Sequence, residues 1–238
     1  MALQSLTVDG ARFRTGRWRS SGDLAYLVPL SPAHTLTGPA LAAAREVLDR
    51  QGFGAIVTAA VAPPERDAFQ RDGFSDREYL HLLRHDLADR PRRRGRWRRT
   101  PPRIERGTRR DTESILALDA RTFDDFWHLD VDGLDDALAA TPVSRLRVIR
   151  DPDVVAYAVA GRAGTQGFVQ RLAVDPDRQG TGLGTALVHE ALDWMHRRGA
   201  AVAWVNTQQA NTRAYDLYRH LGFRPADHHL TVLDRPLP

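Results

Sequence analysis

Residues 171–187, RLAVDPDRQGTGLGTAL, decide the fold of this chain. The apolar run 168–174 predicts a β-strand, residues 175–177 predict a turn, and the glycine-rich loop 179–184 opens a long amphipathic helix. The first backbone N–H groups of a helix have no partner inside the helix, and the helix dipole places partial positive charge there. A strand, a glycine loop and a helix in this order therefore predict a binding site for an anion such as a phosphate.

A second pattern follows downstream, where residues 201–206 predict a strand and residues 211–218, NTRAYDLY, predict a helix that ends before Gly222. Together the two blocks resemble the GNAT family of N-acetyltransferases, whose acetyl-CoA signature is Gln/Arg-x-x-Gly-x-Gly/Ala after a strand. Gln179, Gly182 and Gly184 fill that signature. The resemblance covers roughly residues 103–238 and implies the GNAT fold, an α/β (α+β) architecture with a mixed sheet.

The resemblance implies acetyl-CoA as the cofactor and assigns the residues that hold it. Backbone groups of Leu172 and Val174 would pair with the pantetheine arm like an added strand, and amides of the glycine loop would hold the pyrophosphate. Tyr218 would be the general acid that protonates the departing CoA sulfur. The implied cofactor-binding residues are Leu172, Ala173, Val174, Gln179, Gly180, Thr181, Gly182, Leu183, Gly184, Thr185, Asn211 and Tyr218.

Two of these assignments have alternatives, and the base that some relatives carry is missing. The alternative for Tyr218 is an ordinary core aromatic packed beside Leu217, although its place in Leu-Tyr-x-x-x-Gly-Phe favours the acid role. Asn211 is equally suited to cap the helix that it precedes. Some relatives that acetylate protein N-termini carry a glutamate base where this chain has Asn206, and asparagine cannot act as a base. A water relay, a carboxylate of the acceptor region or His128 would then take the proton from the amine.

The acceptor region follows from two predicted helices, residues 111–120 and 132–140, which the resemblance places at the acceptor entrance. The segment between them carries the aromatic residues Phe126 and Trp127, which we predict to contact the substrate together with Asn206. Acidic residues surround them, a composition that suits an amine arriving as a cation. The alternative is a pair of ordinary amphipathic helices with acidic first turns, which the helix dipole favours.

The N-terminal half repeats the order of the C-terminal half. Its expected elements are strands 11–18, 24–30, 55–61 and 79–87 and helices 39–50 and 64–71. Glycines end helices at equivalent places, Gly52 like Gly199 and Gly73 like Gly222, which indicates an internal duplication. The N-terminal copy resembles a degenerate GNAT half, because residues 33–38 contain a single glycine and Phe69 stands where the second copy has Tyr218.

Residues 91–102 are rich in arginine and proline and separate the two halves. We predict domains at 1–90 (degenerate GNAT-like), 91–102 (linker) and 103–238 (catalytic GNAT domain). An alternative use of the linker is RNA or ribosome binding, since its arginines flank one tryptophan. The overall formal charge of +4 is too small to favour a nucleic-acid partner by itself.

Composition limits the remaining possibilities. A chain of 238 residues with 42% hydrophobic and 27% charged residues is an ordinary globular protein, with no membrane-spanning run and a cytoplasmic location expected. It contains no cysteine, which excludes an acyl-cysteine intermediate, and its histidines lack a metal-ligand pattern, so no metal is expected. The 34 basic side chains are all arginine.

The sequence therefore predicts an acetyl-CoA-dependent N-acetyltransferase that transfers an acetyl group directly to a primary amine. The acceptor is either a small molecule or a protein amine, and its identity and the oligomeric state are left open. The alternatives are a non-catalytic acyl-CoA-binding module, which the missing base allows, and an RNA-associated protein that uses the arginine-rich linker.

Overall fold

The computed structural model describes residues 3–19, 21–88 and 102–238. Their contacts divide the chain into two compact units, which are described one by one. Unit 1 contains residues 1–82, 206–211 and 225–238, and unit 2 contains residues 83–205 and 212–224. The last strand of the chain thus belongs to unit 1. The predicted arginine-rich linker falls largely on residues outside the described ranges, and the domain boundaries at 90 and 103 stay a prediction.

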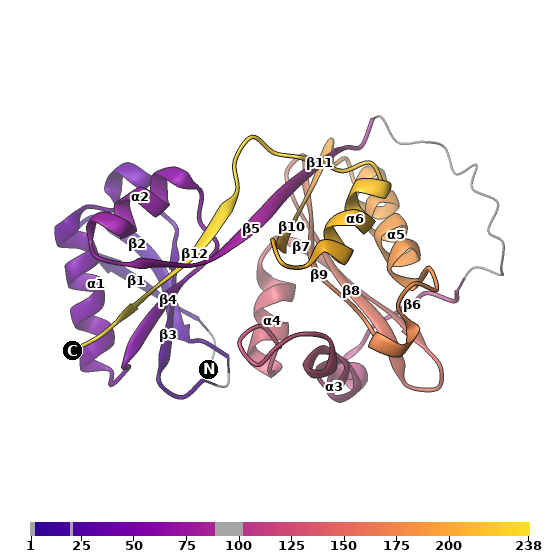
Figure 1. Ribbon diagram of the computed structural model, residues 1–238, viewed down its shortest axis with the longest axis horizontal. Coiled ribbons are helices and arrows are strands. Elements are labelled where there is room, and N and C mark those ends of the chain that lie inside the picture. Colours follow the sequence, from indigo (N-terminus) through magenta and orange to yellow (C-terminus); the bar gives the residue numbers. More distant parts are fainter. Residues whose placement is uncertain (1–2, 20, 89–101) are drawn as a thin grey trace. The chain divides into compact units, whose positions relative to one another are not determined.

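Unit 1 is a mixed sheet covered by two helices (Figure 1). Its strands follow the order β1-β2-β3-β4-β12-β5, in which β3 and β4 are parallel and the other neighbours are antiparallel. The strands are β1 (Gln4–Val8), β2 (Ala11–Arg17), β3 (Leu24–Pro29), β4 (Ala55–Thr58), β5 (Ser75–Asp86) and β12 (Leu230–Pro236), and the helices are α1 (Gly38–Arg50) and α2 (Pro63–Arg71).

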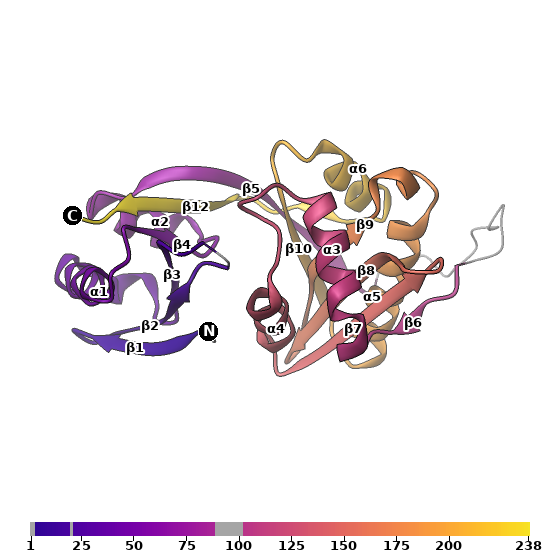
Figure 2. The ribbon, with the colours of Figure 1, turned by 90° about the horizontal axis from the view of Figure 1, so that it is seen from below.

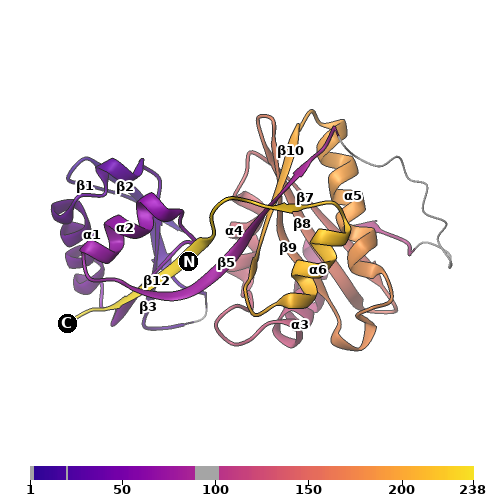
Figure 3. The same cartoon turned by 45° about the horizontal axis from the view of Figure 1, so that its top comes forward.

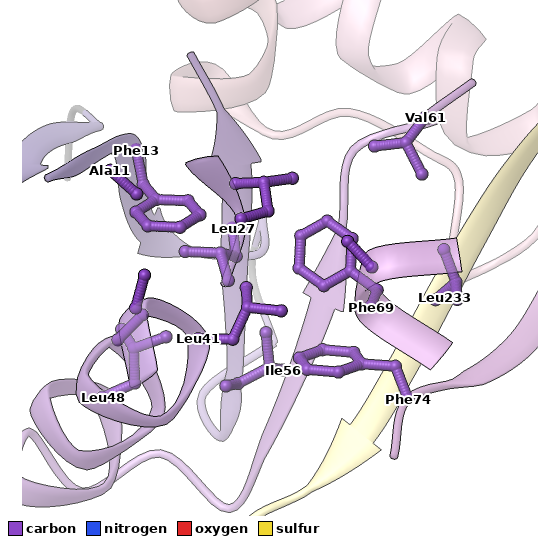
Figure 4. Close-up of a cluster of buried hydrophobic side chains, with 14 of the residues drawn as sticks. Ala11, Phe13, Leu27, Leu41, Leu48, Ile56, Val61, Phe69, Phe74 and Leu233 are labelled. Atoms are coloured by element: carbon purple, nitrogen blue, oxygen red, sulfur yellow. The ribbon is translucent and has the colours of Figure 1, made fainter. Parts of the chain in front are cut away.

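The core of unit 1 forms where the sheet meets both helices (Figure 4). Alternate residues of β2 and β3, such as Phe13 and Leu27, point toward Leu41 and Leu48 of α1. Phe69 of α2 is fully buried in the same cluster. The spacing of the apolar residues in helix 39–50 predicts this packing, and the structure confirms it.

Unit 2 is built around the strand order β10-β9-β8-β7-β6. The strands are β6 (Glu105–Arg106), β7 (Val143–Arg150), β8 (Val154–Ala163), β9 (Gln166–Val174) and β10 (Val202–Gln208), and the short strand β11 (Arg224–Pro225) follows the last helix. The helices are α3 (Thr112–Thr122), α4 (Val131–Ala139), α5 (Leu183–Arg197) and α6 (Thr212–His220). Strand β9 is antiparallel to β8 and parallel to β10.

Helices cover both faces of the unit 2 sheet, as the alternation along β8 shows. Tyr157 and Val159 pack in one cluster with α3 and α4, whereas Ala156 and Ala158 pack in another with Leu187 of α5. The layering can be followed in Figure 2, and Figure 3 shows α5 and α6 next to each other. A strand that is buried on both faces is expected at the centre of an α/β sheet.

The helices of the two halves end in the same way. Gly52 after α1 and Gly199 after α5 both have a φ of +84°, and the next residue in each case donates its N–H to the last helical turn, from Phe53 to Leu48 and from Ala200 to Met195. A left-handed glycine with this six-residue hydrogen bond is the Schellman motif. The predicted correspondence of the two helix ends is therefore confirmed in backbone geometry.

Most expected elements are present with bounds shifted by one to three residues. The edge strand β1 was not expected, because its sequence QSLTV has too few apolar residues to mark a strand. The strand expected at 55–61 ends at Thr58, and the strand expected at 79–87 begins four residues earlier, at Ser75.

Candidate active site

Strand β9 loses one of its two neighbours halfway along its length. Its parallel pairing with β10 ends where Val169 lies beside Val205. Its antiparallel pairing with β8 continues to Val174, with a register shift opposite Gln170. Residues 170–174 therefore present one edge of backbone that no strand of unit 2 pairs. An extended ligand can add to such an edge through main-chain hydrogen bonds.

The loop after β9 is held by its own side chains. Gln179 donates from Nε2 to the carbonyl oxygen of Val174 at 3.1 Å, and its Oε1 accepts a hydrogen bond from Arg213 of α6. Thr181 donates to the carbonyl of Arg178 at 2.5 Å. The side chains of Gln179 and Thr181 thus bond to carbonyl groups and to Arg213, and not to the backbone N–H groups of the loop. Arg213 also places a positive charge beside the loop.

Glycine is required at two positions of this loop by its backbone conformation. Gly180 and Gly182 have φ angles of +77° and +93°, a region that other L-residues rarely adopt. Gly182 is also the N-cap residue of α5, and no side chain caps that helix. The first intrahelical bond comes from Ala186 to Gly182, so the N–H groups of residues 183–185 have no partner inside the helix.

The start of α5 lies directly against the end of β9 and against α6. A Cβ on Gly184 would lie 3.3 Å from Leu217 Cδ2 and 3.5 Å from Val174 Cγ2, so a larger side chain has little room there. The open strand edge, the uncapped helix and the neighbouring Arg213 converge on one end of the sheet. These features fit an extended ligand that ends in a diphosphate, and the residues present are those that acetyl-CoA would need.

Tyr218 lies in α6 and is 4% exposed. Its ring is 5.5 Å from that of Phe223 and belongs to a cluster with Val188 and Leu192 of α5. Burial raises the pKa of the Tyr218 phenol, and the positive charge of Arg171 acts in the opposite direction. The phenol is therefore protonated at neutral pH, as a proton donor must be. The same burial also agrees with the alternative, in which Tyr218 is only a core residue.

A buried ion pair connects β9 to the predicted acceptor region. Asp119 of α3 is fully buried and accepts from Arg171 Nε at 2.9 Å and Arg171 Nη2 at 2.6 Å. It also accepts from the Leu129 N–H at 2.6 Å and from the Tyr157 hydroxyl. Four donors fill the acceptor capacity of a carboxylate. Asp119 is thus a structural counter-ion, which removes it from the carboxylates considered as a base.

The aromatic residues predicted to contact the substrate lie in the segment between α3 and α4. Phe126 and Trp127 are half-buried, with ring centroids 5.1 Å apart. Asp124 accepts hydrogen bonds from the backbone N–H groups of both residues. The carbonyl of Trp127 accepts from Arg171 Nη2 at 2.8 Å, so Arg171 holds this segment close to β9.

The remaining predicted site residues belong to unit 1. Asn206, in β10, is exposed, and Asn211 lies directly before α6 at the position of an N-cap. The site described above is built from unit 2 alone, so the predicted roles of these two residues stay predictions. Among the described residues no group of three or more His, Asp or Glu side chains is placed to hold a metal ion.

Sequence reasoning missed the pair Asp119–Arg171 and its partner Tyr157. A signal was present, since Asp119 follows Ile115 by four positions and therefore lies on the apolar face of its helix. A carboxylate on the buried face of a helix requires a paired cation or several donors. The paired cation, Arg171, is the first residue of the segment 171–187 that decides the fold.

Comparison with known proteins agrees with this geometry. Residues 108–223 match the model of the Acetyltransferase (GNAT) family. They form a GNAT acetyltransferase domain. Enzymes of this family generally use acetyl-CoA. No helix in the described part of the chain is long and apolar enough to cross a membrane.

The curated relatives match only part of the chain. The [Ribosomal protein bS18]-alanine N-acetyltransferase of Escherichia coli (strain K12) is 36% identical over 73 residues, which are 31% of this chain and 49% of that protein. The mycothiol acetyltransferase of Thermobispora bispora is 33% identical over 127 residues, 48% of this chain and 43% of that protein. The chain thus spans about half the length of the bS18-alanine relatives that it matches.

Solved structures match over nearly the whole chain. A tandem GNAT protein from the clavulanic acid biosynthesis pathway has a TM-score of 0.68 at 12% identity and covers 96% of this chain and 79% of its own. A GCN5-related N-acetyltransferase from Kribbella flavida has a TM-score of 0.68 at 15% identity and covers 99% and 90%. At these identities the likeness concerns the fold, and it confirms the predicted GNAT fold with a second, GNAT-like half.

Proposed function

We propose that this protein is an acetyl-CoA-dependent N-acetyltransferase that transfers an acetyl group directly to a primary amine. The observation that carries the proposal is the open edge of β9 followed at once by the uncapped start of α5. The two features give an extended ligand first a strand to pair with and then a cluster of N–H groups for its phosphates.

The residues that would hold acetyl-CoA come from β9, the glycine loop and α5. Backbone groups of Leu172–Val174 pair with the extended arm, and the N–H groups of Gly182, Leu183, Gly184 and Thr185 donate to the diphosphate, with Arg213 adding charge. When bound, acetyl-CoA supplies an acetyl thioester that is activated for attack by an amine. The chain contains no cysteine, so the proposed transfer has no acyl-cysteine step.

Tyr218 is the proposed proton donor to the departing thiolate. Because burial raises the pKa of its phenol, no loss of the acid form is expected below about pH 10. A primary amine with a pKa near ~10 must lose a proton before or during attack. A water relay is the proposed route, since Asn206 cannot accept that proton.

Relatives support two acceptor classes. One set is named for the alanine of a ribosomal protein and the other for mycothiol, so a protein amine and a small-molecule amine are both supported. Acidic residues near Phe126 and Trp127, among them Asp124 and Asp125, favour an acceptor that arrives as a cation.

The test is a turnover assay that measures free CoA with a thiol reagent while primary amines are screened as acceptors. We expect amine-dependent release of CoA, and mass spectrometry should show the acetylated amine. Saturable binding of acetyl-CoA without turnover of any amine would instead identify an acyl-CoA-binding module. Failure to bind acetyl-CoA at all would overturn the site as well as the activity.

A further inference from the structure

The guanidinium of Arg171 is held in one orientation by three kinds of contact. It forms a bidentate pair with Asp119 through Nε and Nη2, and Nη2 also donates to the carbonyl of Trp127. Its central carbon lies 3.5 Å from the centroid of the Phe123 ring, which covers one face of the cation. A planar cation fixed in this way loses little further entropy when it binds a ligand.

One of the three nitrogens of Arg171 remains available. Nη1 has no hydrogen-bond partner within residues 3–19, 21–88 and 102–238, and the side chain is 11% exposed. Arginine offers five N–H donors, and the three contacts through Nε and Nη2 leave the two N–H groups of Nη1. Nη1 is not among the buried side-chain atoms of the described residues that lack a partner, so it reaches solvent and a ligand group can bind to it.

Arg171 lies between the region proposed for acetyl-CoA and the region proposed for the acceptor. It lies on the part of β9 that has lost its pairing with β10, between the backbone proposed for acetyl-CoA and the aromatic segment around Trp127. Its charge is also close enough to lower the pKa of Tyr218, against the effect of burial. A group bound to Nη1 would therefore lie near the reacting amine.

The charges around Arg171 decide which kind of group it binds. Asp119 neutralises the guanidinium, and Asp124, Asp125 and Asp130 lie in the neighbouring segment. A free anion gains little beside a neutralised cation and is repelled by these carboxylates. A neutral carbonyl oxygen accepts the same hydrogen bond without that repulsion.

We propose that Nη1 of Arg171 donates a hydrogen bond to a neutral carbonyl oxygen adjacent to the reacting amine of the acceptor. The protein then favours α-amino amides, the chemistry of a peptide N-terminus, over alkylamines that lack a carbonyl. This proposal rests on the proposed function and adds the feature of the acceptor that is recognised. It assigns no role to Arg171 in proton transfer.

The experiment compares two acceptors of the same shape, alaninamide and 3-methylbutan-2-amine, with wild type and Arg171→Lys. Lysine keeps the charge for Asp119 but has no third nitrogen to present. We expect Arg171→Lys to lower the ratio of kcat/KM for alaninamide to kcat/KM for the alkylamine about 10- to 100-fold, the range for a hydrogen bond to a charged group, because any shift of the Trp127 segment affects both acceptors alike. The two amines differ in pKa, but this difference cancels because the variant and wild type are compared on the same acceptor.

Arg147→Lys is the matched control. Arg147 also forms a partly buried pair, with Glu190 at 3.1 Å, and has no place in the proposed site. Its substitution should leave the ratio of the two acceptors unchanged. An equal loss on both acceptors in Arg171→Lys, or no loss on either, would overturn the proposal while the proposed function stands.

Failure of the proposed function is recognised separately, because wild type would then acetylate neither amine. Calorimetry with the CoA-saturated protein then decides the role of Arg171. Weaker binding of alaninamide to Arg171→Lys than to wild type, with no such change for the alkylamine, would support it. Equal binding to both proteins, or no binding of alaninamide to wild type, would overturn it.

Discussion

The two halves of the chain start equivalent helices in opposite ways. At α1 the side chain of Thr37 accepts from the Ala40 N–H at 3.3 Å, and Pro39 contributes no N–H at all. At α5 the N-cap is Gly182 in a left-handed conformation, and no side chain satisfies the first turn. The same helix position is therefore capped by a side chain in one half and has no side-chain cap in the other.

The strands that precede these helices differ in the same direction. β9 continues for five residues, 170–174, beyond its last pair with β10. β3 continues past its last pair with β4, at Leu27, only by Val28 and Pro29, and proline has no N–H to offer a ligand. We propose on these grounds that the N-terminal half holds no acetyl-CoA and that its role is structural.

Apart from this difference the two halves are alike, and even the packing of single aromatic rings at their helix ends is the same. α2 ends with Phe74 packed on Phe69, ring centroids 5.0 Å apart, and α6 ends with Phe223 packed on Tyr218 at 5.5 Å. In both cases the second aromatic donates its N–H to the carbonyl of the first. The corresponding aromatics Phe69 and Tyr218 thus differ by one hydroxyl. The duplicated fold therefore forms with or without the group to which we assign the chemistry.

The largest expected effect concerns the buried ion pair of unit 2. Asp119→Ala should lower the free energy of unfolding by about 3–5 kcal/mol, because it leaves Arg171 nearly buried and unpaired. Asp72 of unit 1 pairs with Arg45 and Arg235 and is 9% exposed, so Asp72→Ala should cost less. Urea unfolding of both variants measures the two costs. A smaller cost for Asp119→Ala than for Asp72→Ala would contradict the burial argument.

The second prediction exchanges the aromatic hydroxyl between the halves. Tyr218→Phe should lower kcat about 10²- to 10⁴-fold, the range for loss of a general acid, with little change in stability. Phe69→Tyr places a hydroxyl in an apolar core and should cost about 1–3 kcal/mol of unfolding free energy without creating activity. Steady-state kinetics and thermal unfolding measure the pair. Unchanged turnover in Tyr218→Phe would leave Tyr218 as a core residue only.

The smallest effect is expected at the cap of α1. Thr37→Ala should lower the free energy of unfolding by about 1 kcal/mol, because the Ala40 N–H loses its acceptor. The affinity for acetyl-CoA should not change, since the proposed site lies at α5. Thermal unfolding and calorimetry on one preparation test both statements, and an altered affinity would place part of the site in the N-terminal half.

Local patterns were sufficient to predict the frame. Apolar spacing predicted α1 and α5, and the glycines at 52, 73, 199 and 222 predicted where four helices end, because a left-handed residue at a helix end is a local requirement. The loop 179–184 was also predictable, because its glycines mark positions where the backbone takes a left-handed conformation. The uncapped N-terminus of α5 follows from glycine at 182, because glycine has no side chain that could accept from the first turn.

Contacts between distant segments were beyond sequence reasoning. Asp119 and Arg171 are separated by 52 positions, and only the packing of α3 on β9 brings them together. The edge strand β1 has no apolar alternation strong enough to predict it, and the pairing of β12 with β4 joins the last residues of the chain to the first half. These features depend on tertiary packing, which overrides local preference.

The most direct test of the account is a calorimetric titration of acetyl-CoA into wild type and two glycine variants. Gly182→Val and Gly52→Val impose similar strain, since both positions have positive φ (+93° and +84°) and nothing within 4 Å of an added Cβ. We predict saturable binding to wild type and Gly52→Val and an affinity loss of about 100-fold or more in Gly182→Val, because the added side chain would stand where we propose several hydrogen bonds to phosphate. Equal affinity in the two variants, or no binding to wild type, would contradict the assignment of the cofactor to the start of α5.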